Sequence, residues 1–146
     1  MPWAASTDVR WLLLPSVPES SGVCREFVRS AFEQWGLEHG LDDTLLLVSE
    51  LCSNVIRHAG TPMVVGVVWE PTAHLVHVGV RDDSSGMPSV RTPGELAQSG
   101  RGLRIVDAVA QRWGVQPLPA GKIVWFELRV GARRPADPAP VPAPGR

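Results

Sequence analysis

Hydrophobic residues recur every three or four positions between residues 45 and 60. This spacing is typical of an amphipathic helix, because residues three and four apart lie on the same face. The apolar row consists of Leu45, Val48, Cys52, Val55 and Ala59. A second row at steps of four carries a carboxylate, a carboxamide and an imidazole, which belong to Glu50, Asn54 and His58. The pattern predicts a two-faced helix whose polar face is either solvated or part of a site.

Two further segments show helical spacing. The first follows Pro15 and ends near Trp35, where Gly36 stops the helix. Its expected buried positions are Val23, Phe27, Ala31 and Trp35. The second begins near residue 100, and its apolar positions are Leu103, Val106, Ala110 and Trp113. Each of these helices has one apolar stripe, so each is expected to pack that stripe against the core.

Strands are predicted at residues 10–14, 63–69, 74–81 and 123–130, and the second of them is a run rich in β-branched residues. The middle two flank a short turn and indicate a hairpin. Helices and strands together predict an α+β fold, a two-layer α/β sandwich. Its one mixed, mostly antiparallel sheet is covered on one face by three helices. Residues 1–9 are expected to be a flexible N-terminus and residues 132–146 a disordered Pro/Ala-rich tail, which leaves a domain of residues 10–131.

Composition restricts the class of protein. The 146 residues are enough for one domain, and the formal net charge of −1 without a basic run argues against direct nucleic-acid binding. No apolar run approaches the ~20 residues of a membrane span, and the N-terminus lacks a signal-peptide pattern. We therefore expect a cytoplasmic protein with no membrane partner. Cys24 and Cys52 fall on apolar stripes, which favours buried thiols over a disulfide or a zinc site.

Two glycine-bearing turns each follow a predicted strand or precede a predicted helix. They are RDDSSGMP at residues 81–88 and GRGLRIV at residues 100–106. With the row of Glu50, Asn54 and His58 before them, and Gly121 before the last strand, they stand in a characteristic order. The chain thereby resembles the Bergerat-fold ATPase domain of gyrase, heat-shock chaperones, histidine kinases and mismatch-repair ATPases. The resemblance covers roughly residues 10–130 and is closest to the small anti-sigma-factor serine kinases and similar bacterial ATP-binding regulatory proteins.

The resemblance implies roles for the predicted helix at residues 45–60. Asn54 would bind Mg²⁺ through its side-chain carbonyl oxygen, the hard type of ligand that this ion takes. Glu50, one turn earlier, would be the catalytic residue that accepts a proton from the attacking group or orients it. His58 would hold the helix end or support the metal site, and a surface histidine is an equally open interpretation.

The glycine turns would hold the nucleotide, ATP or ADP. Asp82 would accept a hydrogen bond from the adenine amine, which favours ATP over GTP because a carboxylate is only an acceptor. Gly86 would let the backbone pass under the base, and Ser84 replaces the first glycine of the Asp-x-Gly-x-Gly motif. The third helix would present its N-terminus to the phosphates through Gly100, Arg101, Gly102 and Leu103. Gly121 completes the set, and Lys122 after it stands where the family usually has threonine.

The implied function is that of an anti-sigma-factor-like transcription regulator with serine/threonine kinase activity. It would bind a sigma factor or a similar regulator and transfer phosphoryl groups from Mg-ATP to a serine of a small antagonist protein. A homodimer is expected, because the small kinases of this subgroup dimerise. Two alternatives remain open: a non-catalytic nucleotide-sensing module, which Ser84 and Lys122 favour, and a protein whose motifs no longer bind nucleotide. Residues 89–99 correspond to the family's lid and are short, which favours a switch or kinase over a motor.

Overall fold

The computed structural model of the chain describes residues 8–84 and 99–132, with only the backbone described at residues 99–102. The predictions for residues 1–7, for Gly86 and most of the lid segment, and for residues 133–146 lie outside this range. Inside it, the first strand already begins at Asp8, and Ala132 still belongs to a short strand.

The described helices are α1 (Ser20–Trp35), α2 (Leu41–Asn54) and α3 (Ser99–Val109). A π-helical turn, η1 (Val55–Ala59), continues α2, and a 3-10 turn, η2 (Pro71–Ala73), joins the third and fourth strands. The main sheet has the order β1-β3-β4-β6-β5. Its strands are β1 (Asp8–Leu14), β3 (Met63–Glu70), β4 (Leu75–Asp82), β6 (Gly121–Arg129) and β5 (Arg112–Leu118). A separate ladder pairs β2 (Leu37–His39) with β7 (Gly131–Ala132).

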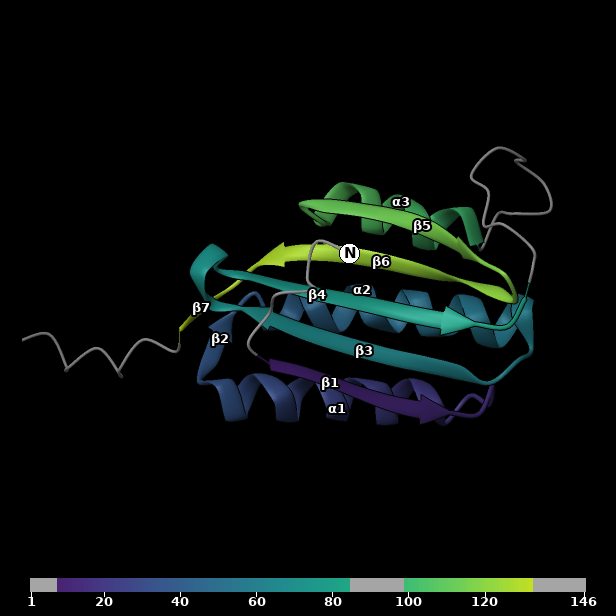
Figure 1. Cartoon of the computed structure of the whole chain (residues 1–146), viewed down its shortest axis with the longest axis horizontal. Coiled ribbons are helices and arrows are strands. Elements are labelled where there is room, and N and C mark those ends of the chain that lie inside the picture. Colours follow the sequence, from purple (N-terminus) through teal and green to yellow (C-terminus); the bar gives the residue numbers. More distant parts are fainter. Residues whose placement is uncertain (1–7, 85–98, 133–146) are drawn as a thin grey trace, which may run out of the picture.

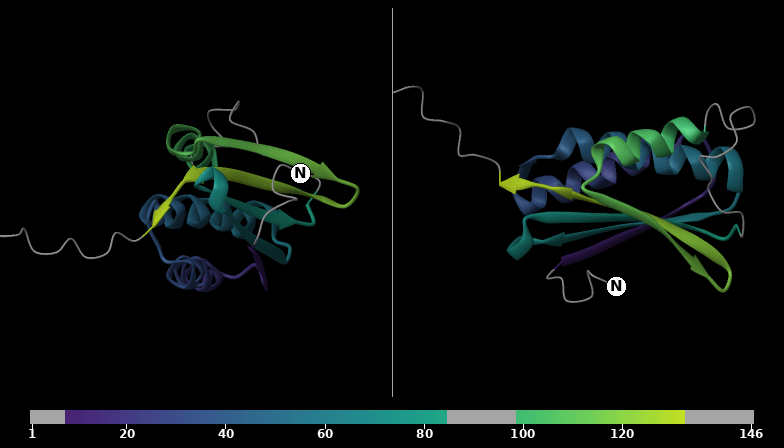
Figure 2. Two further views of the ribbon diagram at one scale, coloured as in Figure 1. Left: turned by 60° about the vertical axis from the view of Figure 1, so that its left-hand side comes forward. Right: turned by 90° about the horizontal axis from the view of Figure 1, so that it is seen from above.

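The helices lie together on one side of the main sheet, and no described helix lies on its other side (Figures 1 and 2). Every strand pairing in the described residues is antiparallel. The predicted α+β sandwich with helices on one face is therefore confirmed. No helix within residues 8–84 and 99–132 is long and apolar enough to cross a membrane.

The core lies between the sheet and the helices, and strand alternation explains which side chains enter it. Successive side chains of a strand point to opposite faces. The buried valines at alternate positions of β3 and β4 therefore all face the helices: Val65, Val67, Val76, Val78 and Val80. Phe32 of α1, Leu47 of α2 and Phe126 of β6 complete the most buried set. Each such side chain contributes about 1.5–3 kcal/mol by leaving water.

The buried stripe of α1 differs from the prediction by one position. Cys24, Val28 and Phe32 are fully buried, as is Ala31, which was predicted. Val23, in contrast, is 48% exposed, and Phe27 and Trp35 are only half-buried. The Sγ atoms of Cys24 and Cys52 lie 3.0 Å apart. The contact between α1 and α2 therefore fixes how α1 is rotated, and that contact is not visible in the sequence of α1 alone. Gly36, with φ of +69°, ends the helix as predicted.

The third helix is shorter than predicted, and a strand was missed. The helix ends at Val109, and Trp113 belongs to β5 instead. The change occurs where the Gln111 N–H donates to the Glu127 carbonyl oxygen at 2.9 Å and so begins the pairing with β6. Trp113 still contacts the helix, because its indole N–H donates to Asp107 at 2.8 Å. Trp113 therefore lies beside α3 as its spacing from Val106 suggested, but it does so from the strand that follows the helix.

Candidate functional site

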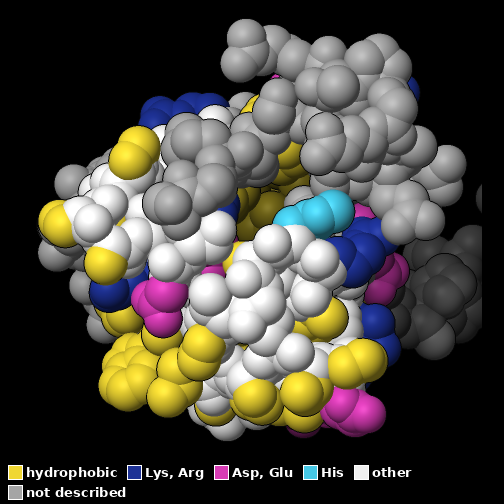
Figure 3. Space-filling view, turned by 90° about the vertical axis from the view of Figure 1, so that its right-hand side faces the viewer, with side chains coloured by type: hydrophobic (Ala, Val, Ile, Leu, Met, Phe, Trp, Pro, Cys, Tyr) yellow, Lys and Arg dark blue, Asp and Glu magenta, His cyan; other side chains and the backbone are white. Residues whose placement is uncertain are grey.

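The predicted site residues meet at one end of the sandwich. The end of α2, the end of β4, the start of β6 and the start of α3 all lie at the right-hand end of Figure 1. Antiparallel pairing explains part of this, because β4 ends where β6 begins and Asp82 is opposite Lys122. In Figure 3, which views this end, a hollow opens beside a histidine side chain, and hydrophobic side chains lie at its floor.

Asn54 is the last residue of α2. Its Oδ1 atom is buried and accepts no hydrogen bond within the described part of the chain. A buried polar atom without a partner costs about 1–3 kcal/mol, so such atoms are rare unless they serve a ligand. A carbonyl oxygen is a ligand type that Mg²⁺ accepts. The observed state of Asn54 therefore fits the role of a metal ligand.

Glu50 and His58 differ in their relation to Asn54. Glu50 lies one α-helical turn earlier on α2 and is half-buried, so it shares a face with Asn54. His58 lies in the π-helical turn η1 and is exposed. The wide turn is closed by the Gly60 N–H, which donates to the Val55 carbonyl oxygen at 3.0 Å. Because a π turn holds more residues than an α turn, the predicted row is interrupted before His58.

Among the described residues at this end, the carboxylate of Asp82 is the most buried charge, with 2% exposure. Its Oδ1 accepts hydrogen bonds from the backbone N–H of Ser84 at 2.8 Å and from Lys122 Nζ at 3.1 Å. Ser84 thus contacts the carboxylate through its backbone. The Ser84 carbonyl oxygen in turn lies 3.5 Å from Lys122 Nζ. These bonds hold the carboxylate in one orientation.

Gly121 is required by the geometry of the β4–β6 contact. Its φ is +106°, and a Cβ atom there would lie 2.0 Å from the Asp82 carbonyl oxygen and 2.8 Å from the Asp83 Cα. No side chain fits at either distance, and the backbone atoms cannot move aside cheaply. The glycine predicted before the final strand is therefore the residue that lets β6 start directly against Asp82.

Gly100, Arg101 and Gly102 lie in the first turn of α3. A helix N-terminus carries free N–H groups and partial positive charge, which suits a phosphate. Leu103, the next residue, is buried. Within the described ranges, no group of three or more His, Cys, Asp or Glu side chains could hold a metal ion. A metal at Asn54 would therefore need further oxygen ligands, such as phosphates.

Lys122 is the residue whose part in this site the sequence analysis missed. It was noted only as a departure from the usual threonine. Lys122 is 7% exposed, and its side chain lies on the same side of β6 as those of Val124 and Phe126, which face the helices. Strand alternation alone could have placed Lys122 on the helix side of the sheet.

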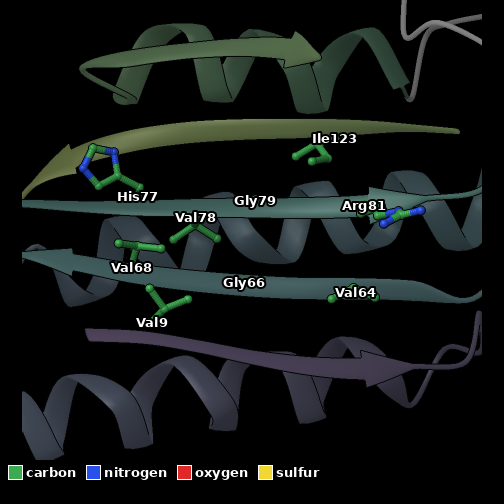
Figure 4. Close-up of a pocket in the computed structure, with 9 residues that line it drawn as sticks. All are labelled: Val9, Val64, Gly66, Val68, His77, Val78, Gly79, Arg81 and Ile123. Atoms are coloured by element: carbon green, nitrogen blue, oxygen red, sulfur yellow. The ribbon is translucent and has the colours of Figure 1, made fainter. Parts of the chain in front are cut away.

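A separate groove of about 210 Å³ lies on the opposite, helix-free face of the sheet, along β4 between His77 and Arg81 (Figure 4). Its floor includes Gly66 and Gly79, which are paired across β3 and β4. This groove contains none of the predicted site residues, so it does not represent the nucleotide site.

Comparison with known proteins agrees with the fold and the motif order. Residues 14–128 match the histidine kinase-like ATPase domain family. An uncharacterized protein of Streptomyces coelicolor is 39% identical over 74 residues, which span 47% of this chain and 69% of that protein. The crystal structure of the RsbU and RsbW domains of Rv1364c from Mycobacterium tuberculosis has the same fold, with a TM-score of 0.65 and 18% identity over 87% of this chain. The chain spans only 34% of that longer protein. The match over most of its length shows that the chain belongs to the histidine kinase-like ATPase domain family.

Proposed function

We propose that the chain is an ATP-binding, anti-sigma-factor-like regulatory protein with serine/threonine kinase activity. Family membership implies nucleotide binding. The observation that carries the proposal is the buried, unpartnered Oδ1 of Asn54, at the same end of the molecule as the start of α3. An unsatisfied acceptor there is costly without a ligand and useful with a cation and a phosphate chain beside it.

Each group at this end has a task in holding Mg-ATP. Asn54 would offer a carbonyl oxygen to Mg²⁺, which neutralises phosphate charge when bound. The N–H groups at the start of α3 would receive the phosphates. Asp82 would accept a hydrogen bond from the exocyclic amine of adenine. Gly121 supports this arrangement, because it lets the start of β6 lie directly against Asp82.

Glu50 would serve the chemical step. The serine hydroxyl of a small antagonist protein attacks the γ-phosphorus, and the bond from that phosphorus to the β–γ bridging oxygen breaks. ADP leaves with that oxygen, and the serine proton passes to the Glu50 carboxylate directly or through water. The half-buried position of Glu50 on the Asn54 face of α2 is compatible with this role.

A protein partner is supported by the helix-free face of the sheet. Val9, Trp11 and Leu13 alternate along β1 and are all more than half exposed. An apolar patch of this kind is typical of a protein-binding surface. The partner would be a sigma factor or a similar regulator, and the same face is a candidate contact for a homodimer.

The primary test is a titration of ATP into the purified protein by calorimetry, with and without Mg²⁺. We expect Mg²⁺-dependent binding that is lost or weakened at least tenfold in Asn54→Ala, with GTP bound more weakly than ATP. Gln111→Ala is a matched control, because it removes an exposed carboxamide beyond the C-terminal end of α3, away from Asn54. Absence of ATP binding in the presence of Mg²⁺ would refute the proposal.

A second function, a nucleotide-sensing module without catalysis, is favoured by the Lys122–Asp82 ion pair, which departs from the family pattern. Labelled ATP incubated with the protein and a candidate antagonist distinguishes the two functions. Kinase activity predicts a labelled serine and its loss in Glu50→Ala, with ATP affinity retained. Glu33→Ala, which changes an exposed glutamate of α1, should label the partner normally. ATP binding without transfer to any antagonist would favour the module.

A further inference from the structure

Lys122 is a buried cation placed beside the carboxylate that would read the base. It is the second residue of β6, it faces the helices, and it lies opposite Asp82 in the sheet. Lysine is rarely buried unless it is paired. Here Nζ donates to Asp82 Oδ1 at 3.1 Å and approaches the Ser84 carbonyl oxygen at 3.5 Å.

Stability alone is a weak reason for this pair. Replacing a buried ion pair by apolar side chains of similar volume is often neutral or stabilising. Because Gly121 lies so close to Asp82, the next residue, Lys122, stands opposite Asp82 in the sheet, and its ammonium group can reach the carboxylate. A second task for Lys122 would explain why the charge is kept there.

The hydrogen-bonding groups of Asp82 and Lys122 that are not used between them indicate what this second role could be. Both hydrogen bonds to the Asp82 side chain use Oδ1, and Oδ2 accepts none from the described residues. A lysine ammonium has three N–H donors, and the two contacts of Lys122 leave one without a partner in the described part of the chain. The pair therefore presents one acceptor and one donor next to each other.

We propose that Lys122 is a specificity-determining residue that reads the purine together with Asp82. The Watson–Crick edge of adenine has the amine N6, a donor, next to the ring nitrogen N1, an acceptor. Asp82 Oδ2 accepts from N6, and Lys122 Nζ donates to N1. The proposal deepens the proposed function and rests on it, because it assigns a recognition role within the same nucleotide site.

The test compares ATP with 1-deaza-ATP, in which a C–H group replaces N1 and removes the acceptor. Dissociation constants are measured by calorimetry with Mg²⁺ for the wild type and for Lys122→Met. A hydrogen bond from a charged donor predicts that the wild type binds 1-deaza-ATP roughly tenfold or more weakly than ATP. Lys122→Met should bind the two nucleotides within about twofold of each other, since its side chain has no donor.

Two controls separate the contact from general effects. Arg129→Met makes the same charge change on β6 but on the exposed, opposite side of the strand, so it should keep the wild-type preference. Lys122→Leu likewise has no donor and serves if the methionine variant does not fold.

Each outcome is decisive. Equal affinity of the wild type for ATP and 1-deaza-ATP would overturn the role of Lys122, even if no variant folds. A preference for ATP that persists unchanged in Lys122→Met or Lys122→Leu would also overturn it, because a donor other than residue 122 would then read N1. If neither nucleotide binds the wild type, the proposed function fails as well, and the two failures are thereby distinguished.

Discussion

Gly121 and Asp82 approach each other so closely that a Cβ on the glycine would lie 2.0 Å from the aspartate carbonyl oxygen. We therefore predict that Gly121→Ala lowers the free energy of unfolding by at least ~3 kcal/mol, since backbone strain and displacement of β6 from β4 add together. Urea denaturation measures the loss, and ATP affinity should fall with it.

The matched control is Gly60→Ala. Gly60 also has a positive φ, of +64°, but a Cβ there meets nothing within 4 Å. Only the cost of the left-handed backbone remains, about 1–2 kcal/mol. Equal losses in the two variants would show that the contact with Asp82 contributes nothing.

Asn54 should be a residue that serves binding at the expense of stability. Its buried Oδ1 has no partner in the described residues, so Asn54→Ala removes an unsatisfied acceptor. We expect the nucleotide-free protein to keep its stability or to gain up to about 1 kcal/mol. Thr44→Val on the same helix provides the contrast. It removes a satisfied hydroxyl, bonded at 2.6 Å to the Gly40 carbonyl oxygen, and should lose about 1 kcal/mol. Urea denaturation in which Asn54→Ala is less stable than Thr44→Val would contradict the assignment of Asn54 Oδ1 as an unsatisfied acceptor.

Asp8 predicts an acid-dependent term in stability. The Trp35 indole N–H donates to its carboxylate at 2.6 Å and, with help from Arg10, holds the pKa of Asp8 below its usual 3.8. The charged form is thus favoured in the folded state. Its contribution is complete above 3.8 and disappears as the pH falls through the lower, folded-state pKa. Asp8→Asn should therefore be less stable than the wild type at neutral pH, and the difference should vanish in acid. Trp35→Phe, which removes the donor, should reduce the same pH dependence. If the stabilities of Asp8→Asn and the wild type changed with pH in parallel, the charged Asp8 carboxylate would not contribute to stability.

The two cysteines should be chemically silent in the folded protein. Both are free and buried, and the hydrogen bond to Cys24 together with burial raises the pKa of the Cys52 thiol well above its usual 9.0. Because the thiolate is the reactive form, an aromatic disulfide reagent at about pH 8 should label neither residue within minutes. Labelling in urea should reach both thiols at once. Immediate labelling of the native protein would contradict the buried contact between α1 and α2.

Trp11 tests the helix-free face as a homodimer contact. The indole is 69% exposed on β1, so Trp11→Lys should leave the monomer folded and weaken self-association. Val23→Lys is the control, because it introduces the same charge at an exposed apolar position of α1. Sedimentation velocity over a range of concentrations measures the effect. A dimer that survives in Trp11→Lys would assign the contact to another surface.

Local patterns predicted the hairpin of β3 and β4, because a β-branched run, a short turn and a second apolar run follow one another over residues 63–81. The rotation of α1 could not be predicted in the same way. Steps of four from Val23 and from Cys24 give two adjacent, similarly apolar rows. Packing against α2 buries the second row and, of the first, only Ala31 fully. The strand β5 contains Gly114 and Pro117, which are depleted in strands, and it forms through pairing with β6.

Motif order identified the family, but the detail of the site depends on tertiary structure. Asp82 and Gly121 were predicted separately, and the register of β4 against β6 is what brings them together. The same register places Lys122 opposite Asp82, which explains why a lysine at this position can pair with that carboxylate. His58 was placed in line with Glu50 and Asn54 on the assumption of α-helical spacing. The π-helical turn that begins at Val55 has a different spacing, so this alignment does not hold.

The helix-free face has a shape that its composition does not reveal. One row across the sheet pairs Trp11 with Gly66, Gly66 with Gly79, and Gly79 with Trp125. Trp11 and Trp125 therefore flank one row in which the two central strands have no side chain. The face is a trough, so a flat surface laid on it would leave the floor empty, and a complementary partner needs a ridge.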